Sequence, residues 1–490
     1  MTRAVPTSRT VRAALCAAVL ALLALAPQAM AARDLETSIM DDQLLLGASQ
    51  EEIDGAMFGF RALGVDRLRV SAFWSSHAPR SESTRKPSFD AANGFDPAYD
   101  WSRLDPVVLA ASRAGLRVMI SISTPAPIWA TAAPRRRNPV LRPNPDEFAA
   151  FARAVAGRYS AVADRFALLN EPNQGAWLQP QSDRRGLVSP HLYRRLVQAA
   201  YPAIKAVAPG AVAVVGELAS SGRSDRGTTR PVRPLEFLRA MSCRSRRFRA
   251  VRTGRCRGFQ PIPADAIGHH PYSLFRSPAA RSPNRDDAAI GDGRRLVRTL
   301  DRLTRSRALR PGSGTRLDVF YTEFGYQTDP PDPFAGISLS RQNRWLQDAA
   351  RVAWSTPRVR ELNQFRLTDG EIRGGRGSRD FSEFQSGLIF AGGRAKPALR
   401  TFPHPFSAST SRPRRGQRVR LWGQVRRGEQ HLVALERRIG RGRFRRIARF
   451  RTDERGIFQR SVPRRRASYR FFYRTGEISG RSAVIAIRPR

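Results

Sequence analysis

The sequence predicts an α/β fold, a TIM (β/α)8 barrel, followed by a small C-terminal all-β sandwich of the immunoglobulin-like kind. Apolar runs that fit buried strands alternate with helical stretches over most of the chain. Two of these runs end on a glutamate, Glu171 and Glu323. A parallel barrel would bring both to one mouth, because the carboxyl ends of its strands meet there. From residue 418 onward, short alternating runs separated by Gly, Arg and Pro indicate the sandwich instead.

The chain is predicted to have four segments. A signal peptide occupies residues 1–32, the barrel 33–402, a proline-containing linker 403–410 and a basic β-sandwich 411–490. The signal peptide is indicated by three arginines, an uncharged apolar run at 13–26 and small residues at 29–32; the run is shorter than the roughly 20 residues that span a bilayer. A retained signal anchor is the alternative. No other stretch is apolar enough to cross a membrane, so we expect a soluble protein that is secreted or held in the cell envelope.

The elements of the barrel are expected in the following order. Strands are predicted at residues 43–48, 65–74, 116–123, 162–170, 211–216, 264–273, 317–325 and 362–369, with helices at 51–63, 101–114, 144–159, 190–207, 293–306 and 340–354. Arg69 lies inside the second strand, where a charge is costly unless it is paired. The alternative is that Arg69 reaches outward to solvent, as we expect of Arg67.

The two strand-end glutamates suggest a specific chemistry. Glycoside hydrolysis uses a pair of carboxyl groups: one protonates the leaving oxygen, and the other attacks the sugar or activates water. Glu171 stands in an Asn-Glu-Pro sequence and Glu323 in Thr-Glu-Phe-Gly. Either glutamate alone could be an ordinary solvated side chain, but the two settings in this chain order favour a catalytic pair.

With these motifs, residues 44–402 resemble the clan A glycoside hydrolases, in the neighbourhood of families 5 and 39 (cellulase-like). The resemblance implies that Glu171 is the acid/base and Glu323 the nucleophile of a retaining enzyme. It further implies supporting roles for Arg69 beside the nucleophile and for Asn170 at the sugar 2-hydroxyl. His270 and Tyr272, which form a His-x-Tyr at the end of the sixth strand, would lie in the active site, with the tyrosine hydrogen-bonded to the nucleophile.

Aromatic residues that follow strands are candidates for sugar contacts, because sugar rings present apolar faces. Trp129 and Trp177 fit this role, as does Trp74, although each alone could equally be packed in the core. Tyr326 is expected near the nucleophile. A third carboxylate, Glu217, follows the fifth strand and is a possible substrate contact.

The eighth strand departs from the clan pattern. Many clan members carry a tryptophan there as the floor of the cleavage subsite, whereas this chain has Gln364, Phe365 and Arg366. The departure bears on which sugar binds at that subsite and on activity itself.

Removing the signal peptide leaves two cysteines, Cys243 and Cys256. An oxidising compartment favours a disulfide between them. A metal site is a poor alternative, because the chain then has only two thiols with no histidine nearby before His269. The adjacent His269 and His270 cannot both reach one ion easily. We therefore expect neither a metal nor a cofactor.

The formal net charge is +44, and only three of the 85 basic residues are lysines. The last 84 residues contain 25 arginines and 5 acidic residues. This charge predicts attraction to a polyanion, such as an acidic polysaccharide or an anionic envelope. The alternative is a general bias toward arginine, because the arginines do not cluster around aromatic residues; no specific nucleic acid is expected.

The sequence thus favours a secreted retaining glycoside hydrolase that cleaves O-glycosidic bonds of an oligo- or polysaccharide. Two alternatives stay open. One is a catalytically silent barrel that binds carbohydrate, and the other is a cationic protein of the cell envelope that binds polyanions.

Overall fold

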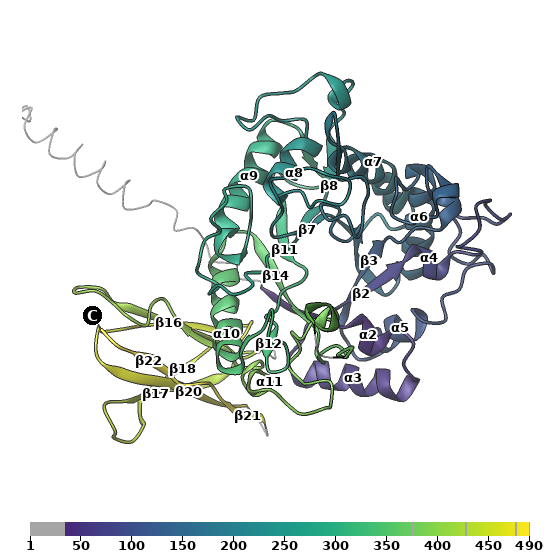
Figure 1. The fold of residues 1–490 in the computed structure, drawn as a ribbon. Helices are drawn as coiled ribbons and strands as arrows, with labels where there is room; N and C mark the ends of the chain where they lie inside the picture. Colours follow the sequence, from purple (N-terminus) through teal and green to yellow (C-terminus); the bar gives the residue numbers. More distant parts are fainter. Residues whose placement is uncertain (1–34, 375–376, 427–428, 476–477, 490) are drawn as a thin grey trace, which may run out of the picture.

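The computed structural model describes residues 35–374, 377–426, 429–475 and 478–489. A barrel with helices around it is joined to a β-sandwich on one side (Figure 1). The predicted signal peptide lies outside the described residues. Within the part of the chain that is described, no helix is long and apolar enough to cross a membrane.

Eight parallel strands close into a barrel in the order β1-β14-β11-β9-β7-β4-β3-β2, which confirms the predicted fold class. The strands are β1 (Glu36–Met40), β2 (Arg67–Phe73), β3 (Arg117–Ser123), β4 (Ala163–Leu168), β7 (Val212–Ala219), β9 (Ala266–His270), β11 (Asp318–Tyr321) and β14 (Val359–Phe365).

The first strand lies earlier than the sequence predicts. Residues 43–48 were expected to form it, but β1 is Glu36–Met40, which pairs in parallel with β14 and β2. The apolar run after it belongs to α2 (Asp42–Leu45), whose first turn is capped by Asp41. The reason is that Glu36 and Ser38 point into a polar part of the barrel interior, where they bond charged and polar partners. A strand of this kind lacks the apolar run that marks a buried strand.

The helices surround the barrel and are α3 (Gln50–Ala62), α4 (Trp74–His77), α5 (Asp105–Arg113), α6 (Pro145–Tyr159), α7 (Ser189–Val207), α8 (Pro234–Met241), α9 (Gly293–Arg305), α10 (Leu339–Ser355) and α11 (Pro397–Thr401). Capping residues mark the N-termini of two of these helices. Ser49 and Glu52 form a reciprocal capping box on α3, and Asn144 caps α6. The short helix α8 was not predicted. Minor strand pairs in the connections are β5 (Ser182–Asp183) with β6 (Gly186–Leu187), β8 (Ile262–Ala264) with β10 (Leu309–Pro311), and β12 (Thr328–Asp329) with β13 (Ile337–Ser338).

The interior of the barrel is layered. At the amino-terminal end of the strands lies a lower charge cluster of Glu36, Arg67, Arg165 and Glu361, all buried. Arg165 Nη1 lies 2.8 Å from Glu36 Oε2 and 2.7 Å from Glu361 Oε2, and Arg67 Nε lies 3.1 Å from Glu36 Oε2. The expectation that Arg67 faces solvent is therefore wrong. Alternate residues of a strand share a face, so Arg67 points inward with Arg69.

An apolar middle layer covers the lower charge cluster. It consists of Met119, Ala167, Val214, Ala266 and Phe320, which pack together inside the barrel. The Arg165 guanidinium lies 4.0 Å from the centre of the Phe320 ring. This layer closes the lower cluster off from the mouth of the barrel.

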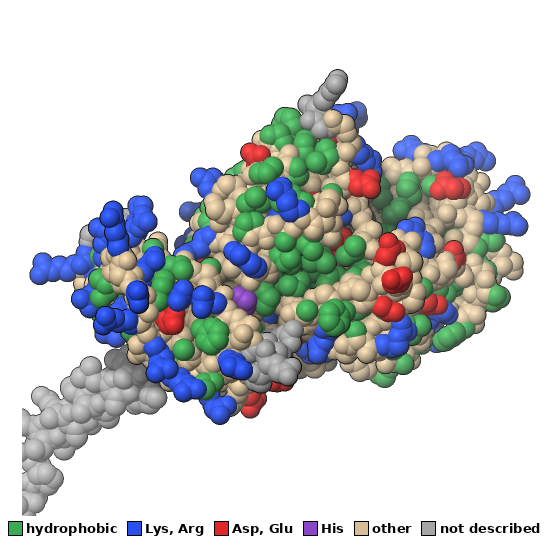
Figure 2. Space-filling model, turned by 90° about the horizontal axis from the view of Figure 1, so that it is seen from below, with side chains coloured by type: hydrophobic (Ala, Val, Ile, Leu, Met, Phe, Trp, Pro, Cys, Tyr) green, Lys and Arg blue, Asp and Glu red, His purple; other side chains and the backbone are tan. Residues whose placement is uncertain are grey.

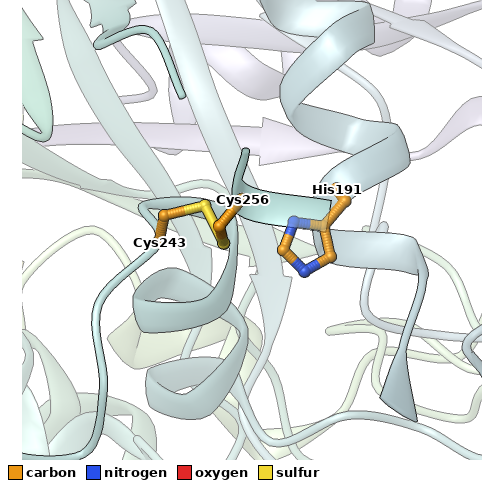
Figure 3. Close-up of side chains that lie close together, drawn as sticks. All are labelled: His191, Cys243 and Cys256. Atoms are coloured by element: carbon orange, nitrogen blue, oxygen red, sulfur yellow. A yellow bond between two sulfur atoms is a disulfide. The ribbon is translucent and has the colours of Figure 1, made fainter. Parts of the chain in front are cut away.

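Cys243 and Cys256 form a disulfide, as predicted. His191 of α7 lies beside it (Figure 3). Burial, together with the positive charge of Arg194, lowers the pKa of His191 to about 4, so its ring is neutral at physiological pH. Arg194 fixes the cysteine loop by donating to Met241 O and, at 2.8 Å, to Arg255 O.

The C-terminal domain is a two-sheet β-sandwich. One sheet contains β15 (Phe406–Ala408), β16 (Val419–Gln424) and β19 (Ile457–Val462), and the other contains β17 (Leu432–Arg438), β18 (Arg445–Arg451), β20 (Ala467–Thr475), β21 (Ile478–Arg481) and β22 (Ile485–Ile487). The predicted linker at 403–410 thus includes the first strand of the sandwich. These residues join the sandwich because the ring of Phe406 packs edge-on against Phe471 in the sandwich core.

The sandwich is packed directly on the barrel domain. Trp422 is buried against Trp354 of α10, with ring centres 6.0 Å apart, and the Arg426 guanidinium covers the Phe402 ring at 3.9 Å. Gly64, at φ +74°, touches the backbone of Arg426 where a side chain would clash. This close packing holds the sandwich against the barrel domain.

Candidate active site

The two predicted catalytic glutamates meet at the mouth of the barrel. Glu171 follows β4 and Glu323 follows β11, and both line a cavity of about 470 Å³. One carboxylate oxygen of each lies within 4.8 Å of the other, and both lie within this distance of a ring nitrogen of His270. Retaining glycosidases hold their carboxyl groups about 5–5.5 Å apart and inverting ones about 6.5–9.5 Å. The spacing here fits the retaining class.

The backbone around Glu171 is strained. Leu169, Glu171 and Glu217 have φ values of 64°, 37° and 48°, in the left-handed region that non-glycine residues rarely adopt. A hydrogen bond of 3.0 Å from Glu171 N to Glu217 O helps to hold this conformation. Strain of this kind concentrates at functional sites, where the surrounding structure stabilises it.

Arg69 is fully buried and lies beside Glu323, as the resemblance implied, and it also bonds two further site residues. Its guanidinium donates to Glu323 Oε1 at 3.0 Å, to Glu217 Oε2 at 2.6 Å and to Asn170 Oδ1 at 3.1 Å. Burial alone would lower the pKa of Arg69, but Glu217 and Glu323 raise it above its ordinary value. The alternative that Arg69 reaches solvent is therefore wrong.

Glu217 does not contact the cavity, so the expectation of a substrate contact is wrong. Its side chain is fully buried and accepts one hydrogen bond from Thr322 Oγ1 at 2.5 Å and one from Arg69 Nη2. A Cβ on Gly268 would come within 2.1 Å of Glu217 Oε1, so a glycine is required beside it. Burial raises the pKa of Glu217, but Arg69 and His270 outweigh burial and lower it to about 2. Glu217 thus supplies a fixed negative charge.

His270 lies between the carboxylates. Its Nδ1 is 3.0 Å from Glu171 Oε1 and 3.5 Å from Glu323 Oε2, and its Nε2 is 3.7 Å from Glu217 Oε2. Burial alone would lower the pKa of His270, but Glu323, Glu171 and Glu217 raise it to about 10. His270 is therefore an imidazolium at neutral pH, with a proton on both nitrogens.

Tyr272 donates to Glu323 Oε2 at 3.1 Å, as the resemblance implied. Glu323 itself is 7% exposed. Burial raises the pKa of Glu323, the charges of His270 and Arg69 lower it, and the neighbouring carboxylates Glu171 and Glu217 raise it again, so that it lies above its ordinary value.

Only some of the predicted aromatic contacts lie in the cavity. Trp177 lines the cavity and stacks on Phe73, with ring centres 6.2 Å apart. Trp129 is buried, packs edge-on against the core residue Trp74 and donates to Pro79 O. The predicted sugar contact of Trp129 is therefore wrong; that side chain belongs to the hydrophobic core.

Tyr326 reaches the cavity wall but not the nucleophile. Its hydroxyl donates to Arg276 O at 2.9 Å, and its ring packs against Trp345. The side chain is buried, so Tyr326 supports the wall of the cavity.

The eighth strand supplies an aromatic side chain in spite of its departure from the clan pattern. Phe365 at the end of β14 lines the cavity, and its ring meets Tyr272 and Phe384 edge-on. Gln364 points the other way and bonds backbone carbonyls, including Ser386 O at 3.0 Å.

Sequence reasoning missed the residues that follow β1. Asp42 and Gln43 line the cavity, as does Glu383 from the connection after β14. Desolvation by the cavity wall raises the pKa of Asp42 to about 6. The sequence contains a pattern that could have identified them, because the polar residues Asp41-Asp42-Gln43 directly follow a strand. They were missed because the first strand was predicted too late in the sequence.

A metal is not favoured at the catalytic residues. Glu171, His270 and Glu323 present three ligand atoms close together. Metal ligands must be deprotonated, whereas the pKa of His270 is raised to about 10. In the other cluster of the described residues, His191 with Cys243 and Cys256, the two sulfur atoms are bonded to each other.

Comparisons with known proteins agree with this geometry. Residues 34–236 match the family model "Cellulase (glycosyl hydrolase family 5)". A family 39 glycoside hydrolase from the gut symbiont Bacteroides cellulosilyticus WH2 has a similar structure, with a TM-score of 0.53 and 14% identity over 87% of this chain and 81% of that one. GH5_18 from Streptomyces cattleya, solved with GlcNAc, gives a TM-score of 0.50 and 15% identity over 75% and 79%. No curated protein matches the chain in sequence.

The solved structures share the fold, and the family model covers the segment that runs through β1 to β7 and contains the Asn-Glu-Pro motif. An eight-stranded parallel barrel with glutamates at the ends of the fourth and seventh strands is the arrangement that the clan resemblance implied. The chain therefore has the barrel fold of these glycoside hydrolases, its residues 34–236 match the glycosyl hydrolase family 5 model, and families 5 and 39 are the families that it resembles.

Proposed function

We propose that this protein is a secreted retaining glycosidase that hydrolyses an oligo- or polysaccharide through a covalent intermediate on Glu323, with Glu171 as general acid and then base. The observation that carries the proposal is the short distance between the two carboxylates, within 4.8 Å, in one cavity.

In the first step the Glu323 carboxylate attacks the anomeric carbon, while the bond from that carbon to the leaving oxygen breaks and Glu171 gives its proton to that oxygen. In the second step Glu171 takes a proton from water, the water oxygen attacks the anomeric carbon, and the ester bond to Glu323 breaks. Atoms and charges balance over the two steps, and no cofactor takes part.

The surrounding residues orient this pair. Arg69 and Tyr272 hold one oxygen each of Glu323, at 3.0 and 3.1 Å. The imidazolium of His270 donates to Glu171 Oε1 at 3.0 Å, which leaves Oε2 to carry the transferred proton. Asn170, tied to Arg69 through its Oδ1, keeps its amide NH₂ for the sugar 2-hydroxyl.

The test is turnover of a panel of aryl β-glycosides by the mature protein, followed by NMR of the first-formed sugar. The expected result is a product with the anomeric configuration of the substrate. A product of inverted configuration would contradict the proposal, as would a Glu171→Gln variant that keeps wild-type activity. Sugar binding without turnover by the wild-type protein would favour the silent carbohydrate-binding barrel.

We also propose that the C-terminal sandwich attracts an acidic polysaccharide or an anionic envelope polymer. Arginine side chains gather over this domain (Figure 2), and Arg445, Arg446, Arg449 and Arg451 of the edge strand β18 are all exposed. Retention of the whole protein on immobilised polygalacturonate should fall steeply between 50 and 200 mM salt, roughly as counterion release predicts for several neutralised charges. Retention that does not change with salt would contradict this role.

A further inference from the structure

A wall of three polar side chains, Gln43, Arg366 and Glu383, lines one side of the catalytic cavity. We call this wall the partition. Its residues come from the segments that follow β1 and β14. All three line the catalytic cavity, and all three also line a second cavity of about 380 Å³. The partition therefore stands between two hollows.

The partition is held by charged hydrogen bonds. Arg366 donates to Gln43 Oε1 at 2.5 Å and to Thr368 O at 3.0 Å, and it also donates to Glu383 O. The amide of Gln43 donates to Glu383 Oε2. Arg366 is 5% exposed, and its Nη2 lies 3.4 Å from Asp41 Oδ1. Hydrogen bonds with ionised partners are about twice as strong as neutral ones, so the wall is well fixed.

On the opposite side of the barrel mouth, the cavity is lined by Gln174 and Trp177 from the connection after β4, by Ser220 and Ser221 after β7, and by Leu274 after β9. Leu274 is 59% exposed. A chain of further sugar units can leave the cavity on this side.

The two ends have different places in the reaction. Glu171, which follows β4, protonates the leaving group, and β4 pairs with β7, so the side opposite the partition belongs to the leaving group. Glu323 forms the bond to the retained sugar, and β11, which precedes it, pairs with β14, which pairs in turn with β1. The partition, which comes from the segments after β14 and β1, therefore faces the retained sugar.

We propose that the partition makes this protein an exo-acting enzyme, which removes one sugar at a time from the non-reducing end of a chain; this rests on the proposed glycosidase function. The terminal sugar enters with its anomeric carbon over Glu323, and its remote hydroxyls bond Gln43, Arg366 and Glu383. A second sugar unit beyond them would collide with the partition. Internal bonds of a polysaccharide are excluded for this reason.

The experiment uses the full-length mature protein and a β-linked hexasaccharide with a fluorescent label at its reducing end. The hexasaccharide is built from the sugar whose aryl glycoside the protein turns over. The expected products are the free monosaccharide and labelled chains that shorten by one unit at a time. Blocking the 4-hydroxyl of the non-reducing terminal sugar with a methyl group should reduce the rate at least tenfold.

A Gln43→Ala/Glu383→Ala variant opens the partition while keeping Arg366. We expect this variant to produce labelled di- and trisaccharides directly from the hexasaccharide, in proportions that the wild type does not show. Glu371→Ala is the matched control, because Glu371 is exposed and lines only the second cavity. Circular dichroism and thermal unfolding establish that each variant is folded.

Each outcome is decisive. Internal cleavage by the wild type at a rate comparable to terminal release would overturn the proposal, and so would a hexasaccharide that is not cleaved at all while its aryl glycoside is. A folded double variant that still releases only monosaccharide would show that the partition does not set the mode of cleavage. If no aryl glycoside is turned over, the proposed glycosidase function itself fails, which distinguishes the two failures.

Discussion

The barrel contains two clusters of arginine and glutamate, one above the other, and they differ in what covers them. In the lower charge cluster Arg67 and Arg165 are paired with Glu36 and Glu361 beneath the apolar middle layer. The upper cluster, Arg69 with Glu217, His270 and Glu323, opens onto a cavity and has Glu171 as an additional carboxylate. Arg67 and Arg69 are two residues apart on one strand.

The comparison shows that residue type alone does not distinguish a structural cluster of charged residues from a catalytic one. The lower cluster is closed, so its charges serve to hold strands together. The upper cluster combines two cations with three carboxylates around a cavity, and burial, with the neighbouring carboxylates Glu171 and Glu217, raises the pKa of Glu323 against the effect of His270 and Arg69. Groups with a perturbed pKa in a cleft are candidates for catalysis.

The largest expected effect is the difference in activity loss between two glutamate variants, one from each cluster. Glu323→Gln should lower kcat/KM on an aryl glycoside by more than the roughly 10²–10⁴-fold that general acid–base catalysis is worth. Glu361→Gln should leave kcat/KM of the folded protein unchanged, but it leaves Arg165 with one buried partner fewer. Breaking a buried pair costs about 3–5 kcal/mol of unfolding free energy. Equal activity losses in the two variants would contradict the comparison.

The two arginines of β2 provide the second contrast. Arg69→Met and Arg67→Met should each lower the free energy of unfolding by about 3–5 kcal/mol, because each removes a buried cation from the carboxylates that it pairs with. Only Arg69→Met removes a positive charge that lowers the pKa of Glu323. In the pH profile of kcat/KM, the acid limb of Arg69→Met should therefore have its midpoint at a higher pH than that of the wild type. An acid limb that moves equally in both variants would refute the separation of the two clusters.

The third contrast concerns two tryptophans. Trp129→Ala should destabilise the protein by about 3–5 kcal/mol, because a large side chain leaves the core, with KM nearly unchanged. Trp177→Ala removes a ring that faces the cavity and stacks on Phe73. Its KM should rise roughly fivefold, in line with the 0.5–1.5 kcal/mol of an aromatic contact. Urea unfolding and steady-state kinetics on the same samples check both effects, and a larger stability loss for Trp177→Ala would contradict the assignment.

The smallest expected effect is a shift of the acid limb of the wild-type kcat/KM profile relative to the ordinary pKa of a glutamate. Glu323 must be ionised to attack, and its pKa lies above the ordinary value of 4.5. Activity should therefore decline as the pH falls, with the midpoint of the kcat/KM profile above pH 4.5. A midpoint at or below pH 4.5 would show that Arg69 and His270 outweigh burial at this carboxylate.

Much of the fold and the reactive pair could be read from the sequence. The strands that carry Glu171 and Glu323 are local apolar runs with polar ends, and such runs mark a buried strand wherever they occur. The first strand was misplaced because it lacks such an apolar run: Glu36 and Ser38 face a polar interior. Asp42 and Gln43, which follow this strand, were missed for the same reason. The aromatic residues Trp129 and Trp177 look alike in sequence, because nothing local distinguishes a ring in the core from one on a cavity wall.

By itself, the sequence determined the order of most strands and helices, the two glutamates at strand ends and the cysteine pair, because each depends on neighbours in the chain. The tertiary structure alone decided which charges face each other inside the barrel. Arg67 and Glu217 became buried, and Gln43, Arg366 and Glu383 met from distant segments. The physical reason is that the cost or benefit of a buried charge depends on the groups that other strands place opposite it.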